Sequence, residues 1–252
     1  MIITSYNQAR ELEKLLGTIR AQSVQPSTII VADDGSSDGT QMLCKQHNIQ
    51  FLTQPDQGYR KAQILNEALR VAQSQYILFI DADTLLEKHF VEDHLKLAQK
   101  DHFVCGRRVD LGRRVSQRPD PLAWRHLIHS ALIGETHGLK RALRLPEPLR
   151  MLLGYTKAID ILGSNWSAWR SDIFAVNGFS ENQNSYWGED GDIYIRLRNM
   201  GKKATNAKGK CIQFHQWHTR RTPNPATVAR YQELLLNKTY TWAPDGIYRT
   251  SL

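Results

Sequence analysis

The stretch Tyr76-Ile77-Leu78-Phe79-Ile80-Asp81-Ala82-Asp83 decides how this chain is expected to fold. Its apolar run has the length of a buried strand and ends at two aspartates. Open α/β sheets bind their ligands beyond the carboxyl ends of strands. Carboxylates two residues apart on an extended strand project to the same side, so Asp81 and Asp83 can hold a hard divalent cation, which in turn takes substrate phosphates.

Working outward, short apolar runs alternate with helical patterns from residue 1 to residue 105. Strands are expected at 1–5, 28–33, 49–53 and 76–81, and helices at 9–22, 38–46 and 60–73. This alternation predicts an α/β fold with a Rossmann-like, mostly parallel central sheet. The turn after the first strand reads Ser5-Tyr6-Asn7-Gln8 and lacks the glycine fingerprint, so a nicotinamide dinucleotide is not expected.

A second acidic cluster, Glu189-Asp190-Gly191-Asp192, follows Tyr186-Trp187-Gly188 and opens a helical pattern. Carboxylates in a first helical turn are ordinary, because they interact favourably with the helix dipole. The aromatic residues and the glycine beside them favour a functional site instead.

The length of 252 residues is enough to bury a substantial core without a metal or disulfide. Cys44, Cys105 and Cys211 are odd in number and lack CxxC spacing, which indicates a reducing compartment. The sequence has no apolar run of membrane-spanning length and no secretory signal, so we expect a cytoplasmic protein. The first strand begins at once, so either the fold starts abruptly or the natural N-terminus lies upstream.

The net charge of +8 is concentrated between residues 107 and 157, where eleven Lys and Arg face four acidic residues. Such a segment attracts nucleic acid, anionic lipid or a phosphorylated saccharide, or it forms a solvated face. Helical spacing of Trp124, Leu127, Ile128 and Leu132 predicts one or two amphipathic helices. We expect most of their leucines to pack on the domain, although a basic amphipathic helix can also lie on an anionic membrane surface.

These changes of character divide the chain into four expected parts. They are an alternating strand–helix half at 1–105, an arginine-rich helical insertion at 106–157, a second half of mixed structure at 158–218, and a C-terminal tail at 219–252 that packs on the domain with a helix near 226–237.

Several motifs, in order, resemble the family-2 glycosyltransferases of GT-A fold. They are Ile3-Thr4-Ser5-Tyr6-Asn7, Ala32-Asp33-Asp34-Gly35-Ser36-Ser37-Asp38-Gly39-Thr40 and Asp81-Ala82-Asp83. Downstream, Gly163-Ser164-Asn165-Trp166, Val176-Asn177-Gly178-Phe179 and Tyr186-Trp187-Gly188-Glu189-Asp190-Gly191-Asp192 resemble the block shared by β-1,4-galactosyltransferases and chondroitin-polymerase-type enzymes. The arginine-rich insertion lies outside the resemblance.

The resemblance implies that residues 1–105 are the nucleotide-sugar-binding half and residues 158–218 the acceptor-binding and catalytic half. It also implies a donor site. Thr4 and Tyr6 match positions that contact the nucleoside, and Asp34 matches the carboxylate that accepts the uracil imide hydrogen. Arg60 matches a basic position near the pyrophosphate, which a guanidinium can grip through two oxygens. Asp81 matches a ribose contact. Read without the family, Asp33 and Asp34 are equally typical of a turn.

The resemblance also implies a metal site made by Asp83 and His215. The related enzymes place a methionine three residues before that histidine, where this chain has Ile212, so water or His218 is left to complete the site. The expected cation is Mn²⁺ or Mg²⁺, and a nitrogen ligand favours Mn²⁺.

For catalysis, the resemblance implies that Asp190 is the general base and that Glu189 orients sugar hydroxyls. Trp187 and, secondarily, Tyr186 would offer a platform to the acceptor ring. The structural alternative for Asp192 is a hydrogen bond to the backbone at the helix start.

The sequence therefore predicts an inverting, metal-dependent hexosyl- or N-acetylhexosaminyltransferase that uses a UDP-sugar and a saccharide acceptor, phosphorylated or lipid-linked, in polysaccharide or lipopolysaccharide assembly. A sugar-phosphate nucleotidyltransferase is the first alternative, but the glycine-rich phosphate loop is missing. A nucleic-acid-binding module is the second, and the sparse aromatic residues within 107–157 disfavour it.

Overall fold

The computed structural model describes residues 1–252 except 156, 183–187, 220–221, 223 and 249–252. The first half contains β1 (Ile2–Ser5), α1 (Ala9–Arg20), β2 (Ile30–Asp33), α2 (Thr40–Gln46), β3 (Gln50–Thr53), α3 (Lys61–Val71), β4 (Tyr76–Asp81), β5 (Thr84–Leu86), α4 (Phe90–Leu97) and β6 (His102–Cys105). The middle contains β7 (Arg108–Asp110), α5 (Arg113–Ser116), α6 (Trp124–Leu132), the 3₁₀ helix η1 (Leu139–Ala142) and α7 (Glu147–Leu152). The last part contains β8 (Trp166–Trp169), α8 (Arg170–Ala175), α9 (Glu189–Asn199), β9 (Lys203–Asn206), β10 (Gln213–His215) and α10 (Pro225–Leu236).

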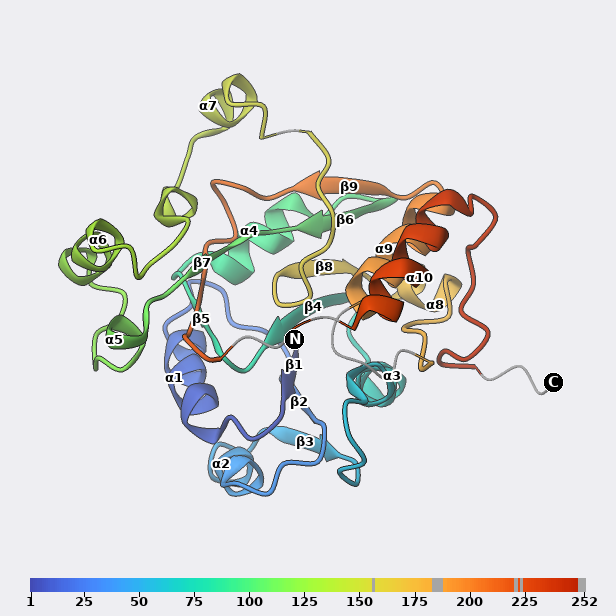
Figure 1. Ribbon diagram of the computed structural model, residues 1–252, viewed down its shortest axis with the longest axis horizontal. Coiled ribbons are helices and arrows are strands. Elements are labelled where there is room, and N and C mark those ends of the chain that lie inside the picture. Colours follow the sequence, from blue (N-terminus) through green and yellow to red (C-terminus); the bar gives the residue numbers. More distant parts are fainter. Residues whose placement is uncertain (156, 183–187, 220–221, 223, 249–252) are drawn as a thin grey trace.

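One seven-stranded sheet forms the centre of the molecule, in the order β3-β2-β1-β4-β8-β6-β9 (Figure 1). All of its pairs are parallel except those that β8 makes with β4 and β6. The predicted α/β fold with a mostly parallel sheet is confirmed. The register places Thr4 opposite Asp81 and Ser5 opposite Asp33, so the polar strand ends meet at one edge.

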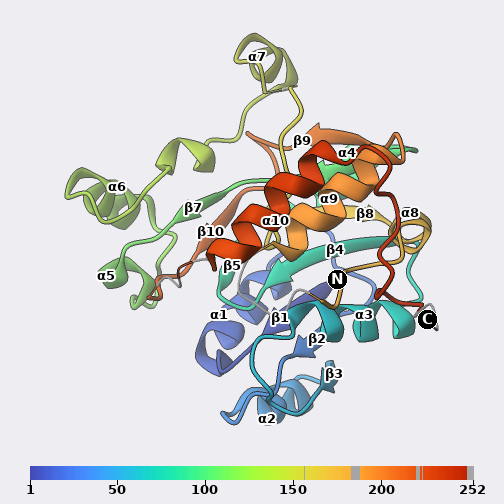
Figure 2. The same ribbon diagram turned by 45° about the vertical axis from the view of Figure 1, so that its right-hand side comes forward.

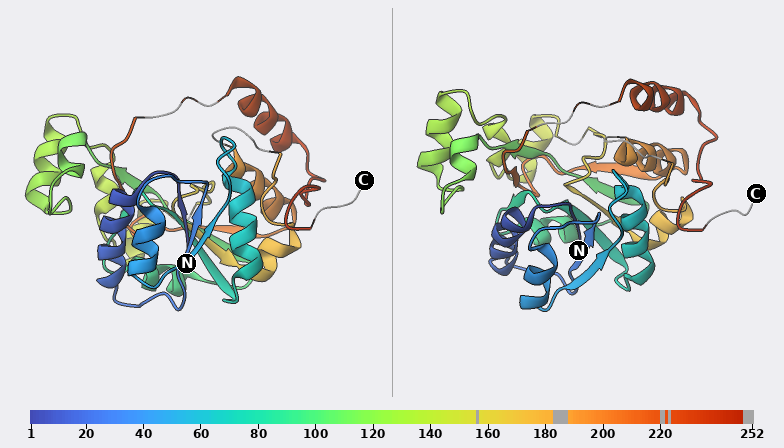
Figure 3. Two further views of the ribbon diagram at one scale, coloured as in Figure 1. Left: turned by 90° about the horizontal axis from the view of Figure 1, so that it is seen from below. Right: turned by 60° about the horizontal axis from the view of Figure 1, so that its bottom comes forward.

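Helices cover both faces of this sheet, because alternate strand residues are apolar on both sides. Ile2 and Phe79 face α3, α8 and α9, whereas Ile3 and Ile80 face α1, α2 and α4. Figure 3 shows α1 and α2 on the opposite side of the strands from α3. The two apolar layers hold the loops beyond β1, β2 and β4 on a rigid base.

A second sheet of three short strands, β5-β10-β7, stands beside the first. In it His215 of β10 lies opposite Thr84 of β5 and Asp110 of β7. The sequence analysis did not predict this sheet, since strands of three residues are too short for a clear alternation. It carries His215 to within reach of Asp83, which precedes β5.

The basic insertion is mostly helical, as expected, but its first residues form β7 of the second sheet. In the described part of the insertion, α5, α6, η1 and α7 follow β7 and stand out from the body (Figures 1 and 2). The expectation that most of its leucines pack on the domain is met only in part, because five of its ten leucines are exposed. Leu127 is buried in the apolar cluster that also contains Phe214 of the second sheet, whereas Leu132, Leu143 and Leu152 are exposed.

The tail places α10 against α9 (Figure 2). Tyr240 donates from its hydroxyl to Asp192 at 2.9 Å, and the Asn177 amide donates to the carbonyls of Ala243 and Tyr248. The three cysteines are buried, free thiols. Among the described residues, no helix combines the length and the apolar character that crossing a membrane requires.

Candidate active site

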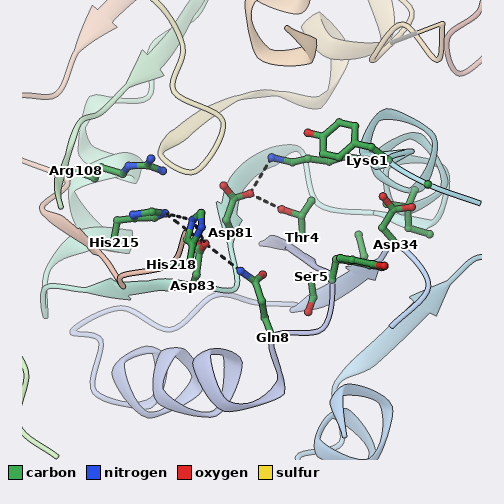
Figure 4. A pocket seen from close by; sticks show the side chains of 15 residues that line it. Thr4, Ser5, Gln8, Asp34, Lys61, Asp81, Asp83, Arg108, His215 and His218 are labelled. Carbon is green, nitrogen blue, oxygen red and sulfur yellow. Dashed lines mark hydrogen bonds and ion pairs between the residues drawn. The ribbon is translucent and has the colours of Figure 1, made fainter. Parts of the chain in front are cut away.

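A cavity of about 280 Å³ opens at the carboxyl ends of β1, β2 and β4 (Figure 4). Open α/β sheets bind ligands at this edge. The lining comes from the strand ends, the start of α3, β7 and the segment after β10. It comprises Thr4, Ser5, Tyr6, Gln8, Ala32, Asp34, Gly58, Tyr59, Lys61, Ile64, Asp81, Asp83, Arg108, His215 and His218.

Asp81 is held at the floor of this cavity by two donors. The Thr4 hydroxyl donates to Asp81 Oδ1, and Lys61 Nζ lies 3.0 Å from the same oxygen. Figure 4 shows both contacts converging on Asp81 from β1 and α3. Asp81 Oδ2 is left for a ligand hydroxyl as far as the described contacts go, which suits the predicted ribose contact.

In the structure one of the two neighbouring aspartates, Asp33, shapes the turn, and the other, Asp34, faces the cavity. Asp33 is a turn former, because its carboxylate accepts hydrogen bonds from the backbone N–H groups of Gly35 and Ser36. Asp34 instead lines the cavity, where it accepts from the Arg60 backbone N–H at 2.8 Å and from the Gln54 amide. Burial raises the pKa of Asp34 from its ordinary value.

Of the two basic residues at the start of α3, Lys61 enters the cavity. The Arg60 guanidinium contacts the Pro55 carbonyl and lies 3.3 Å from Gln63 Oε1, and it is not part of the lining. Side chains of successive residues at a helix start point about 100° apart, so Arg60 and Lys61 do not point in the same direction. The role predicted for Arg60 at the pyrophosphate stays a prediction. Tyr6 lines the cavity and donates to Asp56 at 2.9 Å.

Asp83, His215 and His218 form a cluster with the spacing of metal ligands. One ligand atom from each lies within 4.8 Å of the others. His215 Nε2 is 3.4 Å and His218 Nε2 is 3.3 Å from Asp83 Oδ2, and the two Nε2 atoms are 3.2 Å apart. Asp81 is outside this cluster, so the two aspartates of the first acidic motif do not share its ligand set.

The surroundings of the cluster keep Asp83 charged. Burial alone raises the pKa of this carboxyl, but hydrogen bonds and positive charge from His215 and His218 outweigh burial and hold it well below its usual range. Asp83 Oδ1 is buried and has no hydrogen-bond partner among the described residues. A buried carboxylate oxygen without a partner is costly. A bound cation would satisfy it, so these residues fit a metal.

Two residues that the sequence analysis did not place in the site support the cluster. The Gln8 side-chain amide donates to Asp83 Oδ2 at 3.0 Å. Arg108 lines the cavity from β7, with Nε 3.2 Å from Asp110 Oδ1, and that oxygen lies 3.5 Å from His215 Nδ1. A carboxylate behind a ligating histidine fixes the orientation of its ring. Arg108 reaches the cavity through the pairing of β7 with β10, and this pairing cannot be predicted from the sequence.

Glu189 and Asp190 begin α9 beside the cavity without lining it. Glu189 Oε1 accepts from the Tyr59 hydroxyl at 2.7 Å and lies 3.4 Å from Lys61 Nζ. Lys61 therefore bridges Glu189 and Asp81, which are 108 positions apart in the sequence. The pKa of Lys61 is raised because these two carboxylates outweigh its burial, so the side chain stays charged.

Asp190 sits in a different electrostatic setting. Burial and the neighbouring charge of Glu189 raise its pKa to about 7, against the opposing charge of Lys61. Its Oδ2 accepts from the Gly163 backbone N–H at 2.8 Å. A Cβ at Gly163 would lie 2.4 Å from that oxygen, so only glycine lets the carboxylate approach this backbone.

The remaining predicted residues divide. Tyr186 and Trp187 lie outside the described residues, and their predicted acceptor contacts stay predictions. The Asp192 side chain makes no hydrogen bond to the backbone of any described residue, unlike the structural alternative for it. It pairs with Arg196 in the interior, with 2.7 Å between Arg196 Nε and Asp192 Oδ1, and so serves packing.

Fold and cavity together define an α/β enzyme whose acidic strand ends and Asp–His cluster suit a nucleotide ligand and a divalent cation. The sequence profile of "Glycosyl transferase family 2" matches residues 1–174. The chain belongs to this family, and the predicted family-2 glycosyltransferase is confirmed. The match decides against the nucleotidyltransferase and nucleic-acid-binding alternatives.

Two curated relatives illustrate the likeness. The chain is 31% identical over 101 residues to validoxylamine A glucosyltransferase from Streptomyces hygroscopicus, covering 38% of this chain and 24% of that protein. It is 24% identical over 235 residues to chondroitin synthase from Escherichia coli, covering 86% of this chain and 34% of that protein. The chain thus spans about a quarter to a third of the length of these relatives.

Solved structures show the same fold. A mannosyltransferase from Pyrobaculum calidifontis, in complex with GDP-Man and Mn²⁺, aligns with a TM-score of 0.58 at 20% identity and covers 87% of this chain and 56% of that one. TarS from S. aureus aligns with a TM-score of 0.63 at 14% identity and covers 93% of this chain and 38% of that one. The predicted GT-A fold is confirmed.

Proposed function

We propose that this protein is an inverting, metal-dependent glycosyltransferase that moves a sugar from a UDP-linked donor to a saccharide acceptor. One observation carries the proposal: a single cavity brings together Asp34, Asp81, the Asp83–His215–His218 cluster and Lys61, which contacts Glu189 beside Asp190. The nucleotide, the cation and the base would then serve one reaction centre.

Asp83, His215 and His218 are the residues that would hold the cation. An oxygen and two imidazole nitrogens favour Mn²⁺ over Mg²⁺, and the P. calidifontis mannosyltransferase was solved with Mn²⁺. When bound, such an ion supplies Lewis-acid neutralisation of the diphosphate that leaves. His218 takes the place that the sequence left open at Ile212, whose side chain is buried in apolar packing.

Asp190 is proposed to accept the proton of the attacking acceptor hydroxyl. A carboxylate with a pKa raised to about 7 holds protons more readily than an ordinary aspartate, which suits general-base catalysis at neutral pH. Glu189 contributes a buried Oε2 without a hydrogen-bond partner among the described residues, suited to receive a sugar hydroxyl. Inversion follows if this base works on the face opposite the leaving group.

The donor and acceptor are assigned by chemistry. Asp34 can accept the imide hydrogen of uracil, and Thr4 and Tyr6 line the same part of the cavity. We propose residues 1–105 as the donor half, 158–218 as the acceptor half and 219–252 as a tail on the domain. We also propose a role in polysaccharide or lipopolysaccharide assembly at the cytoplasmic side, and the likeness to chondroitin synthase supports the polysaccharide part of this proposal. A phosphorylated or lipid-linked acceptor would suit the basic insertion.

A nucleotide-sugar screen by thermal shift, with and without Mn²⁺, tests the proposal, because a bound donor raises stability according to its concentration over its dissociation constant. UDP-sugars are expected to raise the melting temperature only when Mn²⁺ is present. GDP- and CMP-sugars at equal concentration serve as controls. Equal stabilisation by all the nucleotide-sugars would reject the UDP assignment. Stabilisation that is the same with and without Mn²⁺ would reject the metal assignment.

A further inference from the structure

The basic insertion carries an unusual share of exposed apolar side chains. Among the described residues, nine of the nineteen exposed large apolar side chains lie within residues 124–153. On α6 they form a stripe: Trp124, Ile128 and Leu132 follow each other at intervals of four residues, while Leu127 packs inward. Leu132 is 82% exposed, and Leu152, at the end of α7, is 81% exposed.

The same segment carries exposed positive charge. Arg114 and Arg125 expose 78% and 76% of their side chains, and each has one surface acidic partner. Arg118 and Lys140 are also exposed, and their side chains form no ion pair within the described part of the chain. The helices that carry this surface stand out from the sheet (Figures 1 and 2), and the stripe on α6 is exposed.

We propose that the α5–α7 surface is a docking site for an anionic lipid bilayer, with α6 lying in the headgroup region. Charge complementarity and the apolar stripe jointly support this occupant, because interfacial helices bury an apolar face beside Lys and Arg that meet anionic headgroups. Trp124 at one end of the stripe has the amphipathic ring that favours the membrane–water boundary.

Other occupants fit these residues less well. A second copy docked face to face would bring two basic surfaces together, and like charges repel. A nucleic acid would neutralise the arginines but leave Leu132 and Leu152 in contact with phosphate and water.

The surface adjoins the cavity. The Trp217 backbone N–H, two residues beyond His215, donates to the Ser116 hydroxyl of α5 at 2.8 Å. The Arg113 guanidinium lies 5.1 Å from the Trp217 ring. A bilayer held at this surface would therefore lie close to the segment that carries the histidines of the metal cluster, where a lipid-borne acceptor could reach the reaction centre.

Vesicle co-sedimentation tests the proposal without donor, acceptor or metal, so its outcome is independent of the proposed reaction. The wild-type protein should bind phosphatidylcholine vesicles that contain 30% phosphatidylglycerol, at about ten times or more the level for pure phosphatidylcholine. Leu132→Ser with Leu152→Ser, and separately Arg118→Glu with Lys140→Glu, should each reduce binding to anionic vesicles by about tenfold or more. Leu236→Ser on α10 and Lys45→Glu on α2 are matched exposed controls that should leave it unchanged.

Equal binding of anionic vesicles by the wild type and both double variants would overturn the proposal. Equal binding of the wild type to vesicles with and without phosphatidylglycerol would also overturn it. A third result would also overturn it: no vesicle binding, together with a concentration-dependent dimer in sedimentation velocity that the leucine variants abolish. That result would make the surface a contact between copies of the chain.

Discussion

The two acidic clusters of this chain look alike in sequence and differ in their surroundings. Asp83, beyond β4, has two histidines against its carboxylate, and its pKa is held well below the usual range although the group is buried. Asp190, at the start of α9, has Glu189 beside it and a backbone N–H as its hydrogen-bond partner, and its pKa is raised to about 7. Both carboxyl groups are buried, so the charge of their neighbours decides the direction in which each pKa shifts.

This difference separates two chemical tasks within one site. A carboxylate that stays ionised suits a metal ligand, and one that exchanges a proton near neutrality suits a base. Lys61 joins the two regions, since it contacts Asp81 on one side and Glu189 on the other. The following substitutions test how far the tasks are separate.

The largest effect is expected from Asp83→Ala. The cluster then loses its carboxylate and leaves two imidazoles that cannot anchor the cation, so transfer should fall by about 10³-fold or more. Mn²⁺-dependent stabilisation by UDP should vanish in a thermal shift assay. Glu13→Ala, which removes an exposed carboxylate on α1 that is not part of the cavity lining, is the control for charge removal. Near-normal transfer by Asp83→Ala would remove the metal site.

Asp190→Asn should lower the turnover number by about 10²–10⁴-fold, because the amide keeps the shape but cannot take the acceptor proton. The Asn oxygen can still accept from the Gly163 N–H, so the loop should hold. Steady-state kinetics should show the loss in kcat, with donor affinity preserved. A loss of donor affinity as large as the loss in kcat would show that Asp190 belongs to the donor or metal site.

A smaller effect should follow from Gly163→Ala. The new methyl would lie within 2.4 Å of the Asp190 carboxylate, which must move. Displacement of a reacting group by about 1 Å costs on the order of 10²-fold, and we expect a decrease in kcat of about 10- to 100-fold. Gly17→Ala on α1, whose Cβ meets nothing closer than 4.0 Å, is the matched control. Unchanged kcat would show that Asp190 is not held by this backbone.

The smallest effect concerns stability and pH. The pKa of Asp190 in the folded protein, about 7, lies above the ordinary aspartate value of 3.8, so between these two values the unfolded chain loses its proton first. The contribution of this group to the free energy of unfolding therefore decreases as pH rises through that window. Asp190→Asn should be more stable than wild type at pH 8, by on the order of 1 kcal/mol or about 2–4 °C, and not at pH 4. Thermal melts at both values provide the comparison, and a difference that does not change with pH would contradict the raised pKa.

Much of the first half could be predicted, because strong alternation and buried strands fix the elements there. The helix expected at 60–73 is observed at Lys61–Val71, and the strand expected at 76–81 at Tyr76–Asp81. The sequence also named Asp83 and His215, which the structure brings together. That pairing came from the family resemblance, because His215 reaches Asp83 only through the short sheet β5-β10-β7, which the alternation of the sequence does not predict.

The rest depended on tertiary pairing that a sequence does not display. Lys61 rather than Arg60 enters the cavity, because neighbouring positions at the start of a helix point in different directions. Arg108 reaches the cavity only because β7 pairs with β10. The leucines of the insertion were expected inside, since periodicity marks an apolar face without showing what covers it.

The most direct test of the division between the clusters is isothermal titration of UDP, with saturating Mn²⁺, into wild type, Asp83→Asn and Asp190→Asn. The account predicts that Asp190→Asn binds UDP within about twofold of wild type while Asp83→Asn loses at least about tenfold in affinity. Comparable losses in both variants, or a greater loss in Asp190→Asn, would contradict the assignment of one cluster to the cation and the other to the proton.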